Sequence, residues 1–470
     1  MSTFKKIITF SFDSLNLFLG MEDFLQEREN LILKINELEK ENADLLCKIQ
    51  EYEALIKKLP SEKDNDANRP LRFKMVTVLF SNVKGFSQLT TKDNAEDLID
   101  ELDKFYFQFD SVVQRYNIEK VNAIGDTYIS AGGIPRKNRT NPIEVVLAAL
   151  EMQQYMKKLQ EDAKLKLSKI WDLTFGIHTG PVNATTSGKK KITFDIKGET
   201  VNIASRIEAS GEIGKIYISG MTHEIVQEYF RCEYIAKIPV KYQGDIAIYS
   251  VKGLRPEYSE DDFGLVPNRK FKTKFQLIKY DDLEEYMLDR LEKELPQHLF
   301  YHNLKHTIDV VIQVELIGRG EEISEEDLLL LKTAALFHDA GHTIKSQEHE
   351  YLGTQIVNEI LPKYGYDQNQ IEIINGIIMA TKLPPTPHTL LQKIICDADL
   401  DYLGRTDFIP VSETLFKELS AQNILTNYNE WNKLQVKFLS GHSYFTDTAN
   451  KLREVNKQGQ IDRIKKLIIE

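Results

Sequence analysis

Residues that could do chemistry gather in the C-terminal third of this 470-residue chain, where six of the ten histidines fall between positions 298 and 349. His302 and His306 stand four residues apart, a spacing that would place both on one side of a helix. His338 and Asp339 are adjacent at the end of an apolar run, and His342 follows four residues after His338. A charged pair at the end of a buried helix is costly unless something compensates it, and a metal ion would do so.

Further candidate ligands follow downstream, at His349 and in the acidic cluster Asp397, Asp399 and Asp401. Imidazole nitrogens together with carboxylate oxygens suit five-coordinate or octahedral Zn, Mn, Fe or Mg. Any single histidine here could be a packed or solvated side chain. The paired spacings, the adjacent His-Asp and a downstream Asp rarely coincide by chance, so the pattern predicts a divalent metal site.

Three separated segments carry a family resemblance: YHNLKHTIDVV at 301–311, ALFHDAGH at 335–342 and ICDADLDYLG at 395–404. Together they resemble the HD superfamily of metal phosphohydrolases over about 300–402. The order YHNxxH and then HDxxH resembles the cyclic-nucleotide phosphodiesterase branch of that superfamily. The resemblance implies an enzyme that hydrolyses cAMP or cGMP to the 5'-monophosphate with two divalent ions.

The resemblance also implies roles for individual residues. Four match the ligands of the first ion: His306, His338, Asp339 and Asp399. Asp339 would also face a bridging water, and His302 matches the residue that protonates the departing ribose oxygen. His342 and His349 are candidates for the second metal or for substrate contact. Asp397 is the rival of Asp399, which the alignment favours.

The chemistry of such a site follows from general principles. A bound divalent ion lowers the pKa of water toward about 7, so that hydroxide can attack phosphorus. A protonated His302 would then neutralise the leaving alkoxide. After Asp401 the chain diverges from the animal enzymes and has no counterpart of their purine-binding glutamine. The resemblance therefore does not say which base the substrate carries. Alarmone or deoxynucleotide substrates are alternatives within the superfamily.

A second resemblance covers nearly all of 72–255. Its four segments are VTVLFSNVKGFS at 76–87, EKVNAIGDTY at 119–128, FGIHTGPV at 175–182 and FDIKGETVNIASRI at 194–207. In this order they resemble the class III nucleotidyl cyclase catalytic domain. That family implies a ferredoxin-like α/β fold and a dimer whose two active sites lie across the subunit interface, with Mg or Mn accompanying a nucleotide.

Four residues keep the cyclase pattern. Asp126 matches one metal carboxylate, and Asp195 matches the carboxylate that recognises adenine. Asn202 and Arg206 match the pair that orients ribose and stabilises the transition state. These residues therefore predict a nucleotide site, although they could also form a hydrogen-bond network without a ligand.

Two positions depart from the cyclase pattern. Asn82 stands where the first metal carboxylate is expected, and an amide lacks the negative charge that two bridged cations require. Asn122 replaces a lysine that helps to select adenine, and it lacks the charge and reach of lysine. We therefore expect a degenerate cyclase domain that acts as a nucleotide-binding, dimeric regulatory module. An active adenylate cyclase and a non-catalytic nucleotide sensor are the alternatives.

The elements that must position these residues divide the chain by pattern. Strand-like runs at 74–80, 128–131, 173–178 and 215–219 alternate with helical runs at 95–116, 142–159 and 200–209, which predicts an α/β domain. From Tyr280 onward the period is helical, which predicts an all-α bundle. The helical runs expected there are 281–295, 302–317, 325–337, 348–361, 369–380 and 389–402.

The predicted organisation is multidomain. It comprises an N-terminal segment (1–20), a coiled coil (21–59), a linker (60–71), the cyclase-like domain (72–255), a second linker (256–279) and the HD domain (280–470). The heptad seam reads Ile35, Leu38, Asn42, Leu45, Ile49, Tyr52, Ile56 and Leu59. Ile at a, Leu at d and a lone Asn at a favour a parallel homodimer. One long helix packed on its own domain is the alternative.

Composition limits the partners. The formal net charge is −11, which argues against nucleic acid as a partner. Three separated cysteines fit a reducing cytoplasm better than a disulfide framework. The sequence contains no run of about 18 apolar residues, so we expect no transmembrane segment. Residues 1–20 lack a signal-peptide cleavage site, so we expect a packed element there, with membrane-surface contact as the alternative.

Overall fold

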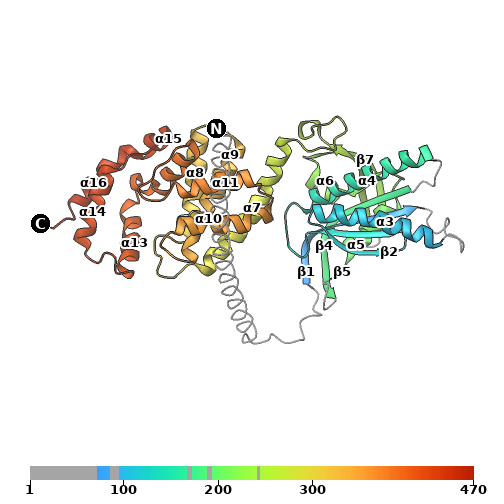
Figure 1. Cartoon of the computed structure of the whole chain (residues 1–470), viewed down its shortest axis with the longest axis horizontal. Helices are drawn as coiled ribbons and strands as arrows, with labels where there is room; N and C mark the ends of the chain where they lie inside the picture. The colour runs from blue at the N-terminus through green and yellow to red at the C-terminus, as the bar shows by residue number, and fades with distance from the viewer. Residues whose placement is uncertain (1–70, 85–94, 167–171, 188–192, 241–243, 470) are drawn as a thin grey trace, which may run out of the picture. The chain divides into compact units, whose positions relative to one another are not determined.

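The computed structural model describes residues 71–84, 95–166, 172–187, 193–240 and 244–469 (Figure 1). Residues 71–470 form one compact unit. The predicted N-terminal segment and coiled coil lie outside the described residues, as does the first linker except for Leu71, which begins the first strand. The heptad therefore stays a prediction. The predicted domain boundaries stay predictions too. None of the described helices combines the length and the apolar character needed to cross a bilayer.

The first part of the described chain is built on a mixed sheet of eight strands. The strands are β1 (Leu71–Lys84), β2 (Glu119–Ile124), β3 (Thr127–Gly132), β4 (Asp172–Ser187), β5 (Thr193–Lys197), β6 (Ile216–Ser219), β7 (Phe230–Val240) and β8 (Gly244–Leu254). Their order is β2-β3-β1-β4-β6-β8-β7, with β5 paired to β4. β4 and β6 run parallel, whereas the other pairs are antiparallel.

Side chains that alternate along β1 bury both faces of this sheet. Leu79 belongs to the core shared with helices α3 (Ala95–Arg115) and α4 (Asn141–Lys166). Its neighbours Val78 and Phe80 belong to a separate core that includes Ala204 of α5 (Glu199–Ala209). The short helix α6 (Gly220–Val226) follows β6 directly. The predicted mixed α/β fold is confirmed.

The rest of the chain is helical, as predicted. Its helices are α7 (Arg269–Glu294), α8 (Leu304–Gly320), α9 (Glu325–Phe337), α10 (His349–Ile360), α11 (Gln368–Met379), α12 (Leu390–Asp399), α13 (Phe408–Ala421), α14 (Tyr428–Gly441), α15 (Asp447–Ala449) and α16 (Val455–Lys465). One apolar core joins residues of α7 to α12, with Leu283, Val314, Leu331 and Ile377 among its buried members. This bundle fixes the helix ends that carry the histidines.

Two helix limits differ from the sequence prediction in ways that matter. Asn303 is the N-cap of α8, where its side chain accepts hydrogen bonds from the backbone N–H groups of Lys305 and His306. His302 therefore precedes the helix, and the prediction that His302 and His306 share one helix face was wrong. The physical reason is the side-chain cap. The Asn303 side chain accepts hydrogen bonds from the first unpaired N–H groups of the helix, so the helix begins after Asn303. α12 ends at Asp399 rather than at 402.

Candidate metal centre

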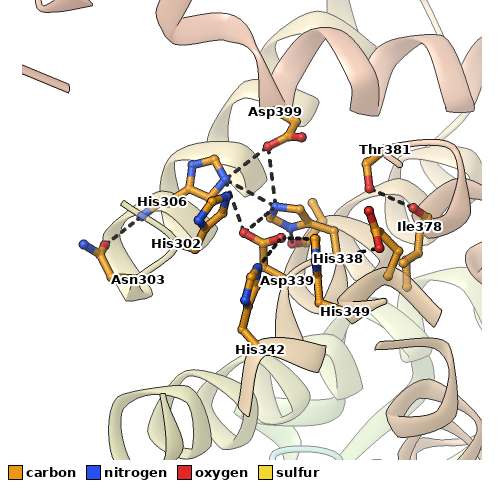
Figure 2. A network of polar contacts seen from close by, with 12 residues as sticks. His302, Asn303, His306, His338, Asp339, His342, His349, Ile378, Thr381 and Asp399 are labelled. Atoms are coloured by element: carbon orange, nitrogen blue, oxygen red, sulfur yellow. Dashed lines mark hydrogen bonds and ion pairs between the residues drawn. The ribbon is translucent and has the colours of Figure 1, made fainter. Parts of the chain in front are cut away.

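Four predicted ligands meet at one point between three helix ends (Figure 2). His306 lies in the first turn of α8, His338 caps the C-terminus of α9 with Asp339 after it, and Asp399 is the last residue of α12. The Nε2 atom of His306 lies 3.1 Å from Asp399 Oδ1 and 3.4 Å from Asp339 Oδ2. The Nε2 atom of His338 lies 3.2 Å from Asp339 Oδ2 and 3.4 Å from His306 Nε2. All four donor atoms therefore face a common centre.

The hydrogen bonding of these groups fits a divalent cation. His338 Nδ1 lies 2.8 Å from the carbonyl oxygen of Ala335, which can only accept, so Nδ1 carries the proton and Nε2 presents its lone pair when the ring is neutral. The Oδ2 atom of Asp339 is buried and has no hydrogen-bond partner among the described residues. Several lone pairs directed at one buried point without a donor between them are what a metal ion satisfies.

The local charge supports the same conclusion. Burial lowers the pKa of His338, but the negative charges of Asp339 and Asp399 outweigh it, so the pKa lies well above its ordinary value. Burial raises the pKa of Asp399, but its close contacts with the rings of His306 and His338 outweigh it, so the pKa is lowered. Both directions show a field that favours positive charge here, which a divalent ion would supply.

A second cluster overlaps the first at Asp339. Ligand atoms of His302, Asp339 and His342 lie within 4.8 Å of one another. Within it His342, together with His349, is the candidate to contact a second ion, and His302 is the candidate proton donor. The ring of His342 stacks on those of His302 and His349, with centroids 4.8 and 4.1 Å apart. His349 Nε2 lies 3.5 Å from Asp339 Oδ1. Asp339 thus stands between the two clusters, where a bridging ligand would be needed.

His302 is held by a carboxylate that the sequence analysis did not single out. Glu418, a buried residue of α13, lies 2.5 Å from His302 Nδ1 and accepts hydrogen bonds from the backbone N–H groups of Tyr301 and His302. Burial lowers the pKa of His302, but the hydrogen bond to Glu418 and the charge of Asp339 leave it raised overall. Because Nδ1 bonds Glu418, Nε2 is the nitrogen left for the substrate side.

The rival aspartate does not join the centre. Asp397 is fully buried and accepts hydrogen bonds from the backbone N–H groups of Phe445 and Thr446 and from the Thr446 hydroxyl. Asp401 pairs with Arg453, with Oδ1 2.6 Å from Nε. Both carboxylates are therefore occupied elsewhere, and Asp399 alone of the three contacts the histidines.

In the sheet domain, two of the predicted nucleotide residues are brought together. Asn82 on β1 stands opposite Thr127 on β3 and donates a hydrogen bond from Nδ2 to its hydroxyl, at 3.0 Å. Asp126 immediately precedes Thr127, and its carbonyl oxygen accepts from the backbone N–H of Val83. The structure thus brings one amide and one carboxylate close together at this end of the sheet.

The other four cyclase-pattern residues lie at the surface. The side chain of Asn122 accepts from the backbone N–H of Ala123, and Asp195 pairs with Lys197 at 3.1 Å. Asn202 and Arg206 are one turn apart on α5, and Arg206 donates to the carbonyl oxygen of Pro239 at 3.2 Å. No described contact joins any of these four to the Asn82 and Asp126 corner.

Family models recognise both parts of the chain. Residues 69–253 match the adenylate and guanylate cyclase catalytic domain, and residues 303–401 match the HD domain. Each of these two parts of the chain is thus similar to a known domain family.

Individual relatives match the cyclase part. Guanylate cyclase 32E of Drosophila melanogaster is 31% identical over 193 residues, which is 40% of this chain and 16% of the relative. Human guanylyl cyclase C is 29% identical over 202 residues, 42% of this chain and 18% of the relative. The chain thus spans less than a fifth of either relative. A solved guanylate cyclase domain of RhGC from Catenaria anguillulae, in complex with GTP, is 26% identical, with a TM-score of 0.36, over 39% of this chain and 100% of that one.

Proposed function

We propose that the chain is a metal-dependent phosphodiesterase that hydrolyses a cyclic nucleotide, cAMP or cGMP, to the 5'-monophosphate. The observation that supports this most is the convergence of His306, His338, Asp339 and Asp399 on one buried point beside a carboxylate-bound His302. Phosphodiester hydrolysis needs cations at the phosphoryl oxygens and a proton for the leaving oxygen, and both requirements have candidate residues here.

His306, His338, Asp339 and Asp399 would hold the first divalent ion, and His342 and His349 lie where they could contact a second ion or the substrate. Ions bound there would polarise the phosphoryl oxygens and make water a better nucleophile near neutral pH. Asp339, between the two clusters, is placed to orient the attacking water. His306, His338 and Asp339 are buried, which strengthens the charge interactions among them.

The leaving oxygen would receive its proton from His302. Glu418 holds Nδ1, so the ring is oriented with Nε2 toward the centre, and the nearby carboxylates favour the protonated form. When Nε2 gives its proton to the ribose oxygen, the imidazole returns to its neutral form. This arrangement lets His302 act as the general acid.

The cyclase-family domain would serve as a dimeric, nucleotide-binding regulatory module. Asn82 supplies an amide where a second carboxylate would be needed beside Asp126, which argues against efficient ring closure. The similar relatives are named guanylate cyclases, so a purine nucleoside triphosphate is the proposed regulatory ligand. The predicted heptad would pair two chains.

An active cyclase is the alternative. It is tested by an assay of wild type and the Asn82→Asp variant with Mn²⁺ and ATP or GTP. A strong gain of cyclic product in the variant would show that only the carboxylate is missing.

Hydrolysis of cyclic nucleotides tests the proposal directly. The full chain is given cAMP and cGMP with Mn²⁺, Mg²⁺, Zn²⁺ or Fe²⁺, and products are separated by chromatography. We expect the 5'-monophosphate, with at least about a 10²-fold loss in kcat for His338→Ala and Asp339→Asn. His298→Ala, at an exposed histidine, is the matched control and should keep full activity. Absence of hydrolysis with every metal would reject the assignment.

A further inference from the structure

A cavity of about 300 Å³ adjoins the candidate metal centre and shares His306 and Asp399 with it. The volume is at the lower end of the range for small-molecule sites. Four aspartates and two cationic side chains are among its lining residues. Acidic groups therefore outnumber basic ones, so this cavity does not suit the phosphate, whose place is at the metal centre. It suits an uncharged part of the same molecule that carries both hydrogen-bond donors and acceptors.

Among the described residues, Arg405 is the arginine that lines the cavity, and its position is fixed. Its Nε and Nη2 atoms donate to the two carboxylate oxygens of Asp407 at 2.8 and 2.6 Å. Its Nη1 atom lies 3.5 Å from Asp309 Oδ2, which is longer than a hydrogen bond. A guanidinium carries five N–H donors in a rigid fork, so this pairing leaves donors on Nη1 for a ligand.

Acceptor and aromatic groups complete the lining. Asp309 Oδ2 contacts Lys305 Nζ at 3.1 Å and faces Arg405, which leaves Oδ1 for a donor on a ligand. The rings of Tyr301 and Tyr402 lie with centroids 5.4 Å apart, and Tyr402 also lines the cavity. Aromatic side chains bind nucleobases by stacking. A heteroaromatic ring with hydrogen-bonding edges thus matches the cavity in size and polarity.

We infer that this cavity binds the base of the cyclic nucleotide and that Arg405 selects guanine; the inference rests on the proposed phosphodiesterase function. Guanine presents two adjacent acceptors, O6 and N7, which an arginine recognises with paired donors. Its N–H groups on the other edge suit the carboxylate of Asp309. Adenine places an amino donor beside N7, which would face the N–H groups of Arg405 and leave a buried donor unpaired.

Steady-state kinetics of the full-length enzyme with cGMP and cAMP test this inference. Arg405→Met should lower kcat/KM for cGMP by about tenfold or more, mainly through KM, and change the value for cAMP by less than about threefold. Asp309→Asn should also lower kcat/KM for cGMP. It replaces Arg405→Met as the test variant if the melting temperature shows that Arg405→Met does not fold. Arg319→Met, at an exposed arginine paired with Glu315 on α8, is the control and should leave kcat/KM unchanged for both substrates. Equal losses for both substrates, no loss, or a wild-type preference for cAMP would overturn the inference.

Equilibrium binding separates this inference from the function on which it rests. Calorimetry with 5'-GMP and 5'-AMP needs no turnover. If the wild-type chain hydrolyses neither cyclic nucleotide but binds 5'-GMP more tightly than 5'-AMP, with the difference lost in Arg405→Met, the phosphodiesterase proposal fails and the base site stands. Equal binding of the two monophosphates would overturn the base site.

Discussion

The imidazole of His302 depends on a carboxylate that stands 116 positions away in the chain. Glu418 holds one ring nitrogen and two backbone N–H groups at the start of the YHN segment, so it fixes both the ring and the loop that carries it. Glu418 reaches the site only through His302 and the backbone of Tyr301, and we regard it as a positioning residue for the general acid.

Glu418→Gln should lower kcat by about 10²-fold, because the amide can neither orient the ring as well nor stabilise its charged form. The pH profile gives the specific readout. The carboxylate raises the pKa of His302, and a general acid must be protonated, so loss of the carboxylate should move the alkaline limb of kcat to lower pH. Glu413→Gln, at an exposed glutamate of the same helix, should leave the profile unchanged. A parallel drop in kcat with no shift of the limb would show a purely structural role.

The metal ligands could be predicted because each lies in a short, recognisable segment, whereas Glu418 lies in FKELSA, which resembles no motif. The available signal was weak: an acidic residue on the face of α13 that also buries Phe408 and Ser412. Arg405 and Asp309 were missed for another reason: only the fold brings α8 and the loop before α13 to one cavity.

At the scale of elements, α12 separates two carboxylates that the sequence places only two positions apart. Residues two apart on a helix differ by about 200° around its axis, so Asp397 and Asp399 must face different ways. Asp397 faces the segment 445–446, and Asp399 faces the histidines. The end of α12 therefore carries one aspartate that anchors the segment 445–446 and one that is a candidate metal ligand.

Paired substitutions should separate these two roles. Asp397→Asn should lower the free energy of unfolding by about 2 kcal/mol, because its amide group opposes two backbone donors, yet it should keep metal binding. Asp399→Asn should abolish hydrolysis and metal binding while changing the stability of the metal-free protein by less than about 1 kcal/mol. Chemical denaturation and bound-metal analysis of both variants measure this. A reversed outcome would mean that Asp397 is the ligand after all.

Element prediction succeeded where burial is strong and failed where it is partial. The run 325–337 is helical to the residue, since nearly every side chain in α9 beyond its first turn is buried. β2, β5, β7 and β8 were not predicted; exposed positions of β2 and β7 carry charged residues such as Lys120 and Glu233. α7 begins at Arg269, well before the helical run expected from 281, and its Phe271 packs into the core of the sheet domain.

At the scale of the whole molecule, buried histidines outside the metal centre link stability to pH. Burial lowers the pKa of His178 in β4 and of His442 after α14 to about 4 each. An unfolded chain has a histidine pKa near 6.5, so it binds protons between about pH 6.5 and 4 that the folded chain does not. The free energy of unfolding should therefore fall as the pH drops through this window.

His178 alone should contribute a decrease of about 3 kcal/mol between pH 7 and pH 4. In His178→Gln, urea denaturation should show a shallower dependence of stability on pH over that window. His298→Gln, at an exposed histidine, should keep the wild-type slope. An unchanged slope in His178→Gln would mean that this ring becomes protonated without unfolding.

The account as a whole depends on a divalent ion within the helical bundle, and bound-metal analysis by mass spectrometry tests it most directly. The full chain, purified without chelator and then desalted, should carry at least one equivalent of a divalent transition metal per chain. His338→Ala and Asp339→Asn should lose it while remaining folded. A folded wild-type chain that retains no metal, and takes up none from Mn²⁺ or Zn²⁺ solutions, would contradict the central claim.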